Sequence, residues 1–204
     1  MNRTLVFKNR QRVRRVDTPL LRRITRWLLE ESLRVRDWEL CVHLVGAEEM
    51  ARVNQAFLGH AGSTDVITFD HSEASQPDSY YFPMALGGIG PSASSPHPPP
   101  PSDGGEGARR TGAEALISDA AVYQGELASL QGELFVCLDD AVKQAKEFKT
   151  AWQSELTRYV IHGLLHLRGH DDLKPAARRV MKKEENRLLR EISREFSLPR
   201  LARQ

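Results

Sequence analysis

Two kinds of hydrophobic pattern alternate along the first part of the chain. Runs with the alternation or the β-branched composition of strands cover residues 4–9, 38–45 and 65–69. Runs with an apolar residue every three or four positions, as in amphipathic helices, cover 19–33 and 48–57. Because Pro19 suits the first turn of a helix, we predict that the first helix begins there, with Thr18 as its N-cap.

The same two patterns return after residue 131. We predict a buried strand over 134–138, followed by helices over 139–148, over 154–167 and from 175 past 189. Asp139 or Asp140 is expected to cap the first of these helices, and Gly169 to end the second. Four strands with helices between them predict an α+β fold: a single domain with a small, mixed, four-stranded sheet packed against about five helices.

The segment 72–131 differs in composition from the rest of the chain. It holds eight of the eleven prolines and eight of the fourteen glycines, including HPPPP at 97–101. Such a segment buries too little apolar surface to offset the entropy of ordering it. We therefore expect a mostly disordered, low-complexity insertion, with a marginal helix over 113–130, and a folded domain made of 1–71 and 132–204.

Overall composition is that of an ordinary globular protein, with 40% hydrophobic and 27% charged residues among 204. No apolar run reaches the ~20 residues that span a bilayer, and the N-terminus lacks the apolar core of a signal peptide. The two cysteines, Cys41 and Cys137, lie in strand-like runs and are too few for a disulfide scaffold. We expect both to be buried free thiols in a cytoplasmic protein without a membrane partner.

Positive charge is concentrated near both ends of the chain. Residues 1–36 hold eleven Lys and Arg against three acids, and residues 174–204 hold ten against four. Clustered basic charge favours polyanions, since neutralising phosphates releases counterions. Solvated faces of Arg-rich helices would give the same pattern, so the charge alone leaves both interpretations open.

The segment YVIHGLLHLRGHDD (159–172) holds the residues most typical of chemistry. His162 and His166 are four positions apart, which places both imidazoles on one face of a helix, one turn apart. After Gly169 the chain can fold back and present His170, Asp171 or Asp172. Two imidazoles and a carboxylate, with one position left for water, are the ligands of a catalytic zinc site, whereas buried unpaired imidazoles would be costly.

The same motif excludes the zinc proteases that carry H-E-x-x-H. The residue after His162 is Gly163, so this helix offers no glutamate as a general base. A metal-dependent hydrolase of peptides or small molecules is therefore disfavoured, and the basic surface argues against it as well.

Three segments together resemble the YbeY family of bacterial endoribonucleases and rRNA maturation factors. HGLLHLRGHDD at 162–172 follows the signature of that family, STDVITF at 63–69 is similar to its P-T-D/N-V-L-S-F strand, and GELFVCLDDAVKQA at 132–145 is similar to its G-D-I-x-I-C strand and following helix. Their order and approximate spacing agree, apart from the insertion. The resemblance covers most of 1–71 and 132–192.

The resemblance implies one zinc ion and metal-assisted cleavage of single-stranded RNA in the cytoplasm, in 16S rRNA 3′-end processing and ribosome quality control on the small subunit. It places the ligand and catalytic roles on His162 and His166. The third histidine of the family falls on Asp172, a carboxylate that binds zinc at much the same distance. His170 is the second choice for the third ligand, and Asp171 is expected to orient the turn or a ligand.

One position departs from the family in a way that bears on activity. The family carries an arginine, thought to contact phosphate, in a Y-R-G sequence, and Leu58 occupies this position here. The neighbouring His60 could supply an RNA contact instead. The missing arginine modestly favours an alternative in which the chain is a non-catalytic ribosome-assembly factor with a structural metal site.

Overall fold

The computed structural model describes residues 2–72 and 129–203, which form one compact unit. Its strands are β1 (Arg3–Asn9), β2 (Asp37–Val45), β3 (Val66–Asp70) and β4 (Ser129–Cys137). Its α-helices are α1 (Thr18–Trp27), α2 (Ala47–Leu58), α4 (Leu138–Glu147), α5 (Trp152–Leu167) and α6 (Pro175–Glu195). A π-helical turn, Leu28–Ser32, prolongs α1, and a 3-10 turn, Leu198–Leu201, follows α6.

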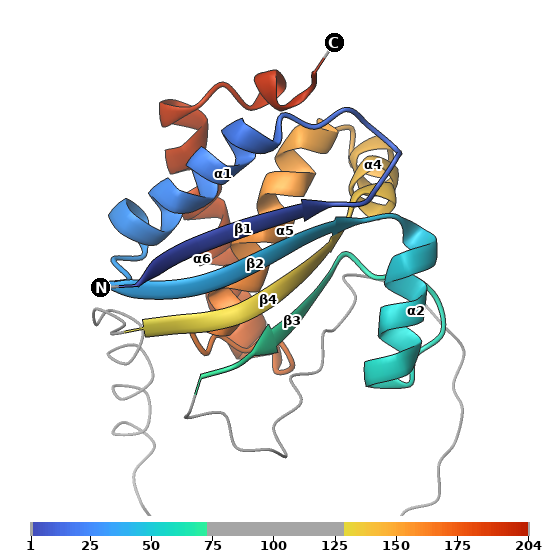
Figure 1. The fold of residues 1–204 in the computed structure, drawn as a ribbon, viewed down its shortest axis with the longest axis horizontal. Helices are drawn as coiled ribbons and strands as arrows, with labels where there is room; N and C mark the ends of the chain where they lie inside the picture. Colours follow the sequence, from blue (N-terminus) through green and yellow to red (C-terminus); the bar gives the residue numbers. More distant parts are fainter. Residues whose placement is uncertain (1, 73–128, 204) are drawn as a thin grey trace, which may run out of the picture. The chain divides into compact units, whose positions relative to one another are not determined.

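The four strands form one mixed sheet in the order β1-β2-β4-β3 (Figure 1). β1, β2 and β4 are parallel, and β3 runs antiparallel to β4, with Val66 opposite Val136. The predicted α+β fold, with one mixed four-stranded sheet and five helices, is thereby confirmed. The segment expected to be disordered lies outside the described residues except at its ends, and β4 begins at Ser129, three residues before the expected boundary.

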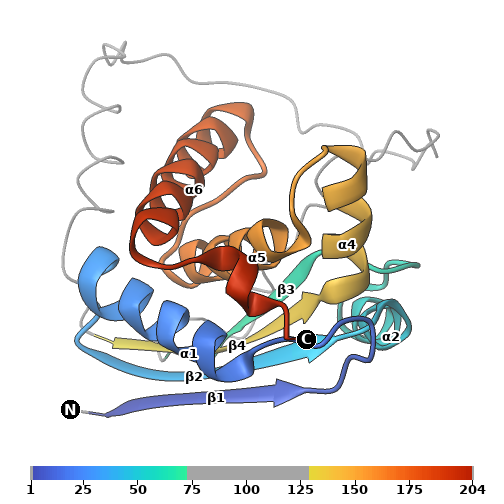
Figure 2. The same cartoon turned by 90° about the horizontal axis from the view of Figure 1, so that it is seen from above.

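The main core lies between the sheet and helices α1, α5 and α6, which Figure 2 shows on the same side of the sheet. Because successive residues of a strand face opposite ways, the even-numbered residues of β2 from Trp38 to Leu44 point into this core. α2 covers part of the other face, where Met50 packs against Val45, Ile67 and Cys137. The burial of Cys137 agrees with the expectation from sequence, whereas Cys41 is only half-buried; both thiols are free.

Close approach to the sheet requires a glycine in α5. A methyl group at Gly163 would lie 2.7 Å from Cδ2 of Leu134 and 3.3 Å from Cγ2 of Val66, well inside ordinary van der Waals contact for Leu134. The helix can therefore rest directly on β3 and β4 at this point. His162 precedes Gly163, so the same approach places the first histidine of the motif beside the sheet.

Two predicted helix caps are wrong. Asp17, not Thr18, caps α1, since its Oδ1 accepts a hydrogen bond from the backbone N of Leu20 at 2.9 Å. No side chain caps α4, which begins at Leu138. Asp139 instead accepts from the backbone N of Ala47 at 2.7 Å and so caps α2, a partner 92 residues away that local sequence cannot indicate. Among the described residues, no helix is long and apolar enough to cross a membrane.

Candidate metal centre

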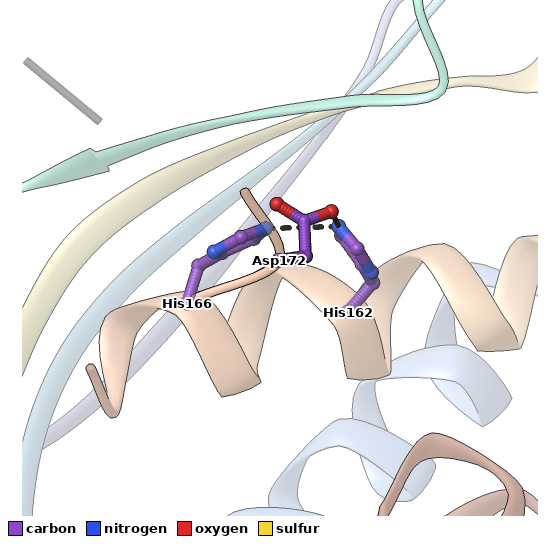
Figure 3. Close-up of side chains that lie close together, drawn as sticks. All are labelled: His162, His166 and Asp172. Carbon is purple, nitrogen blue, oxygen red and sulfur yellow. Dashed lines mark hydrogen bonds and ion pairs between the residues drawn. The ribbon is translucent and has the colours of Figure 1, made fainter. Parts of the chain in front are cut away.

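His162 and His166 lie on the last two turns of α5, the most deeply buried helix of the described chain. Every residue of α5 from Tyr159 to Leu167 is buried, and the two histidines are only 4% and 6% exposed. Their spacing of four residues puts both rings on the same side of the helix, where Figure 3 shows them turned toward each other. Two imidazoles held this deeply need polar partners, because an unpaired buried polar group is costly.

The chain folds back on the helix immediately after α5 ends. Gly169 adopts a left-handed conformation with φ of 83°, and its backbone N donates to the carbonyl of His166 at 2.8 Å. The N of His170 likewise donates to the carbonyl of Leu165 at 3.0 Å. This turn brings Asp172, which is 3% exposed, over the two imidazoles (Figure 3).

Three side chains of the motif converge on one point. The Nε2 atoms of His162 and His166 lie 2.9 Å apart, and Nε2 of His162 lies 3.9 Å from Oδ2 of Asp172. One ligand atom from each of the three residues lies within 4.8 Å of the others. Of the histidine, cysteine and carboxylate groups that the structure describes, these form the cluster suited to a metal ion.

The other candidates from the sequence lie outside this cluster. His170 contributes its backbone, whose carbonyl accepts from Nδ1 of His166 at 3.0 Å. Asp171 orients the turn, since its Oδ1 accepts from the backbone N of Leu173 at 2.9 Å. His60 is exposed in the loop after α2, and Leu58 is a packing residue at the end of α2, against the cluster around Met50.

The hydrogen bonds of the two imidazoles fix which ring nitrogens are available. Nδ1 of His162 is 2.6 Å from Oε1 of Glu185, and Nδ1 of His166 is 3.0 Å from the carbonyl of His170. A carboxylate and a carbonyl only accept, so both Nδ1 atoms must donate. In the neutral rings both Nε2 atoms therefore present lone pairs to each other. Only a cation, either a proton or a metal ion, can make this arrangement favourable.

A proton fills that role when no metal ion is bound. Burial lowers the pKa of His162, but the hydrogen bond and charge of Glu185, together with Asp65 and Asp172, outweigh burial and raise it above its ordinary value. Burial, with the neighbouring positive charge of His162, lowers the pKa of His166 to about 4. His162 thus carries the proton and His166 accepts from it.

The donor set fits zinc. Nitrogens bound at about 2.0–2.1 Å in tetrahedral geometry lie about 3.3 Å apart, and the separations of 2.9 and 3.9 Å bracket this value. Oδ1 of Asp172 is buried without a hydrogen-bond partner among the described residues, as expected for a carboxylate whose partner is a cation. Two imidazoles and one carboxylate also leave a fourth position for water or substrate, the pattern of catalytic rather than structural zinc.

Glu185 of α6 is a buried partner of the cluster that was not predicted from the sequence. Besides the hydrogen bond of Glu185 with His162, its Oε2 lies 3.6 Å from Nη1 of Arg158, which is one turn before His162 on α5. Although burial raises the pKa of Glu185, the hydrogen bond to His162 lowers it overall. A signal was present: Glu185 falls on the buried stripe of α6 with Met181, Leu188 and Ile192, where a carboxylate needs a partner.

A third carboxylate acts on His162 from the residue before β3. Asp65 is 5% exposed, and its Oδ1 accepts from the hydroxyl of Thr64 at 3.0 Å, while Oδ2 has no hydrogen-bond partner among the described residues. Burial raises the pKa of Asp65, and the charge of His162 opposes the rise. The TDV segment thus places a carboxylate beside the cluster, a role that its sequence alone did not reveal.

The known relatives of this chain include proteins named Endoribonuclease YbeY. Endoribonuclease YbeY of Salinibacter ruber is 29% identical over 153 residues, which is 75% of this chain and 69% of that protein. Endoribonuclease YbeY of Chlorobium phaeovibrioides is 28% identical over 145 residues, 71% of this chain and 62% of that protein. Both matches leave about a third of the relative uncovered.

A solved structure and a family model agree with these two relatives. The solution structure of TM1509 from Thermotoga maritima superposes with a TM-score of 0.51 at 22% identity, covering 96% of this chain and 91% of that one, which shows a shared fold. The family model described as Endoribonuclease YbeY matches residues 6–193. This chain belongs to the YbeY family of endoribonucleases, which are hydrolases that act on RNA.

Proposed function

We propose that this protein is a zinc-dependent endoribonuclease that cleaves single-stranded RNA during rRNA maturation, in 16S rRNA 3′-end processing and ribosome quality control on the small subunit. The observation that carries the proposal is the convergence of Nε2 of His162, Nε2 of His166 and a carboxylate oxygen of Asp172, with no proton donor among them once His162 is neutral. Membership of an endoribonuclease family supplies the class of substrate. Two free thiols agree with a cytoplasmic location.

Each residue of the cluster has a distinct task in this proposal. A zinc ion held by the three ligands would supply Lewis acidity toward a phosphodiester and acidify water. Glu185 keeps Nε2 of His162 available by accepting a hydrogen bond from Nδ1, and the carbonyl of His170 does the same for His166. Such partners fix the tautomer and the ring orientation of a metal-binding histidine.

Leu58 leaves the site without the family arginine, but Arg178 of α6 contacts a ligand residue. Its Nε donates to the backbone carbonyl of Asp172 at 3.0 Å, and its side chain is otherwise exposed. We propose that Arg178 provides the positive charge for a bound phosphate beside the cluster. A guanidinium suits this task because its donors match the geometry of phosphate.

The alternative is a ribosome-assembly factor in which the metal only fixes the turn after α5. Leu58 favours this alternative, because its side chain packs against the apolar cluster around Met50 and cannot bind phosphate. The two functions separate in a cleavage assay of the purified full chain, with its zinc content quantified, on single-stranded and duplex RNA of the same sequence.

Cleavage of the single strand alone, abolished in the His162→Ala/His166→Ala variant, is the expected result. Intact RNA in the presence of about one zinc per chain would instead identify the assembly factor. A circular dichroism spectrum of the variant shows whether loss of cleavage merely reflects loss of fold.

A further inference from the structure

A polar cavity lies away from the metal centre. It has a volume of about 650 Å³ and is formed by the loop between β1 and α1 together with the C-terminal segment. The cationic side chains that line it are four arginines, Arg12, Arg14, Arg15 and Arg203. Its lining shares no residue with the metal cluster and, within the described chain, includes no carboxylate.

The cavity and the metal cluster lie toward opposite ends of α5. The segment that follows α6 lies against Ser154, in the first turn of α5, whereas His162 and His166 are on its last two turns. Figure 1 shows the β1–α1 loop and the C-terminus together at the end of the sheet where β1 and β2 end. A ligand in the cavity would therefore not compete with one at the metal.

The loop that carries the arginines is held in place by a buried side chain. Gln11 is 8% exposed, and its Oε1 accepts from the backbone N of Val13 at 2.7 Å and of Arg14 at 3.1 Å. Its Nε2 donates to the carbonyl of Arg14 at 2.8 Å. On the far side, the backbone N of Arg203 donates to the carbonyl of Arg15 at 2.9 Å. The backbone is thus ordered before any ligand binds, which reduces the entropic cost of binding.

Positive charge continues beyond the cavity. Exposed arginines of α1, at positions 22, 23 and 26, extend the basic surface along the neighbouring helix. Asp17 is the acidic residue nearest in sequence to the arginine-rich loop. Its Oδ2 lies 3.8 Å from Nε of Arg203, whose side chain is 62% exposed. Arg10, which directly follows β1, forms an ion pair with Glu49, with 2.6 Å between its Nη2 and Oε1 of Glu49. Four arginines nevertheless line the cavity, and the described part of its lining holds no carboxylate.

We propose that this cavity is a binding site for the phosphates of single-stranded RNA outside the cleavage site; the proposal rests on the RNA substrate of the proposed function. All its cations are arginines, whose planar fork matches phosphate with two parallel hydrogen bonds. The large exposed hydrophobic side chains of the described residues all lie elsewhere: Val6, Phe57, Phe148, Leu173 and Val180. The cavity thus lacks the apolar anchors typical of protein-binding or membrane-binding surfaces.

The test compares two sets of three charge removals in the full-length protein. The cavity variant is Arg12→Ala/Arg14→Ala/Arg15→Ala, and the matched control is Arg179→Ala/Lys182→Ala/Lys183→Ala on the exposed face of α6. The probe is a fluorescent, uncleavable 2′-O-methyl 20-mer of uridine, whose binding is followed by anisotropy as salt is increased. Thermal melts of both variants verify folding.

The cavity variant is expected to bind the 20-mer about tenfold or more weakly near 0.1 M salt. Its slope of log K against log salt should fall in magnitude by about 2, for three lost contacts with a single strand. Arg12→Lys/Arg14→Lys/Arg15→Lys should recover most of the slope, since it keeps the charge, but not all of the affinity. Equal losses of RNA affinity in the cavity variant and in the α6 control would overturn the proposal, because they would indicate diffuse electrostatic attraction of RNA and not a defined site.

Three further measurements separate this proposal from its alternatives. If the cavity variant loses binding to poly-glutamate as strongly as to RNA, the cavity recognises acidic protein and the RNA assignment fails. Cleavage of a trinucleotide too short to reach the cavity should be unchanged in the variant. Wild-type protein that cleaves no RNA, while the cavity variant loses RNA binding, would refute the proposed nuclease and leave the RNA site standing.

Discussion

At the scale of single residues, the imidazole of His162 depends on a hydrogen bond from its Nδ1 to Glu185, a residue of another helix. His162 and His166 follow from a spacing of four on an apolar helix, which the sequence displays directly. Glu185 lies 23 positions after His162, and its bond depends on how α6 packs against α5. Asp172 and His170 were both plausible third ligands, because the direction of a side chain after a helix stop depends on the turn, which places Asp172 over the rings.

Replacing Asp172 or His170 tests which residue is the third ligand. Asp172→Ala should weaken zinc binding by more than the about 10- to 100-fold that is typical for loss of an outer partner. His170→Ala keeps the backbone carbonyl that holds His166, so it should change zinc affinity by less than about tenfold. Asp172→His, which introduces the residue of the family at this position, should retain binding. Competition with a fluorescent chelator measures the zinc affinity of all three variants. A larger loss of affinity in His170→Ala than in Asp172→Ala would identify His170 as the third ligand.

The role of Glu185 has a matched control in the adjacent carboxylate. Glu185→Ala should reduce zinc affinity about 10- to 100-fold, because His162 loses the acceptor that fixes its tautomer. Glu185→Gln keeps an acceptor but no charge and should fall between this variant and wild type. Glu184→Ala removes a carboxylate that binds Arg187 instead, so its zinc affinity should match that of wild type. Equal effects at 184 and 185 would show that the loss of negative charge, and not orientation, matters.

At the scale of elements, the strands and helices were predicted because their hydrophobic periods are regular. The less local of the two wrong caps arises where a distant element competes with a local rule. Asp139 looks like a cap for α4, in whose first turn it lies, yet its carboxylate accepts from the backbone N of Ala47 in α2. Similarly, the π-helical turn after α1, with Leu33 N bonded to Leu28 O at 2.8 Å, has no local signal that separates it from ordinary helix.

Gly163 is expected to set how closely α5 approaches the sheet. Gly163→Ala gains about 1 kcal/mol of helix propensity, but its methyl would lie 2.7 Å from Leu134, and overpacking typically costs about 1–3 kcal/mol. We expect a net loss of stability in urea unfolding. Gly163→Ala/Leu134→Ala should be more stable than the sum of the two single effects implies, since the second change makes room for the methyl. A single variant at least as stable as wild type would show that the contact is not restrictive.

At the scale of the whole molecule, metal binding, protonation and stability are linked. In the metal-free protein the raised pKa of His162 stabilises the fold at low pH, and this contribution is lost as pH rises through the folded pKa. The lowered pKa of His166 acts in the opposite sense: its contribution is present above about 6.5 and is lost as pH falls toward about 4. Zinc must displace the proton of His162, so protons and zinc compete for one site.

This linkage predicts how the stabilisation by zinc depends on pH. The difference in Tm between zinc-loaded and EDTA-treated protein should widen from about pH 5.5 to about pH 8, because fewer protons compete with zinc as pH rises. In the His162→Ala/His166→Ala variant the difference should vanish at every pH. Differential scanning calorimetry provides both values. A difference that is constant with pH would mean that zinc binds through groups that do not titrate in this range.

The central claim is that His162, His166 and Asp172 hold one metal ion, and native mass spectrometry of the full chain tests it most directly. After exposure to zinc and removal of the excess, wild-type protein should carry one zinc per chain, as expected for one cluster. The folded His162→Ala/His166→Ala variant should carry none. A wild-type chain without zinc, or a variant that retains it, would contradict the assignment of the site.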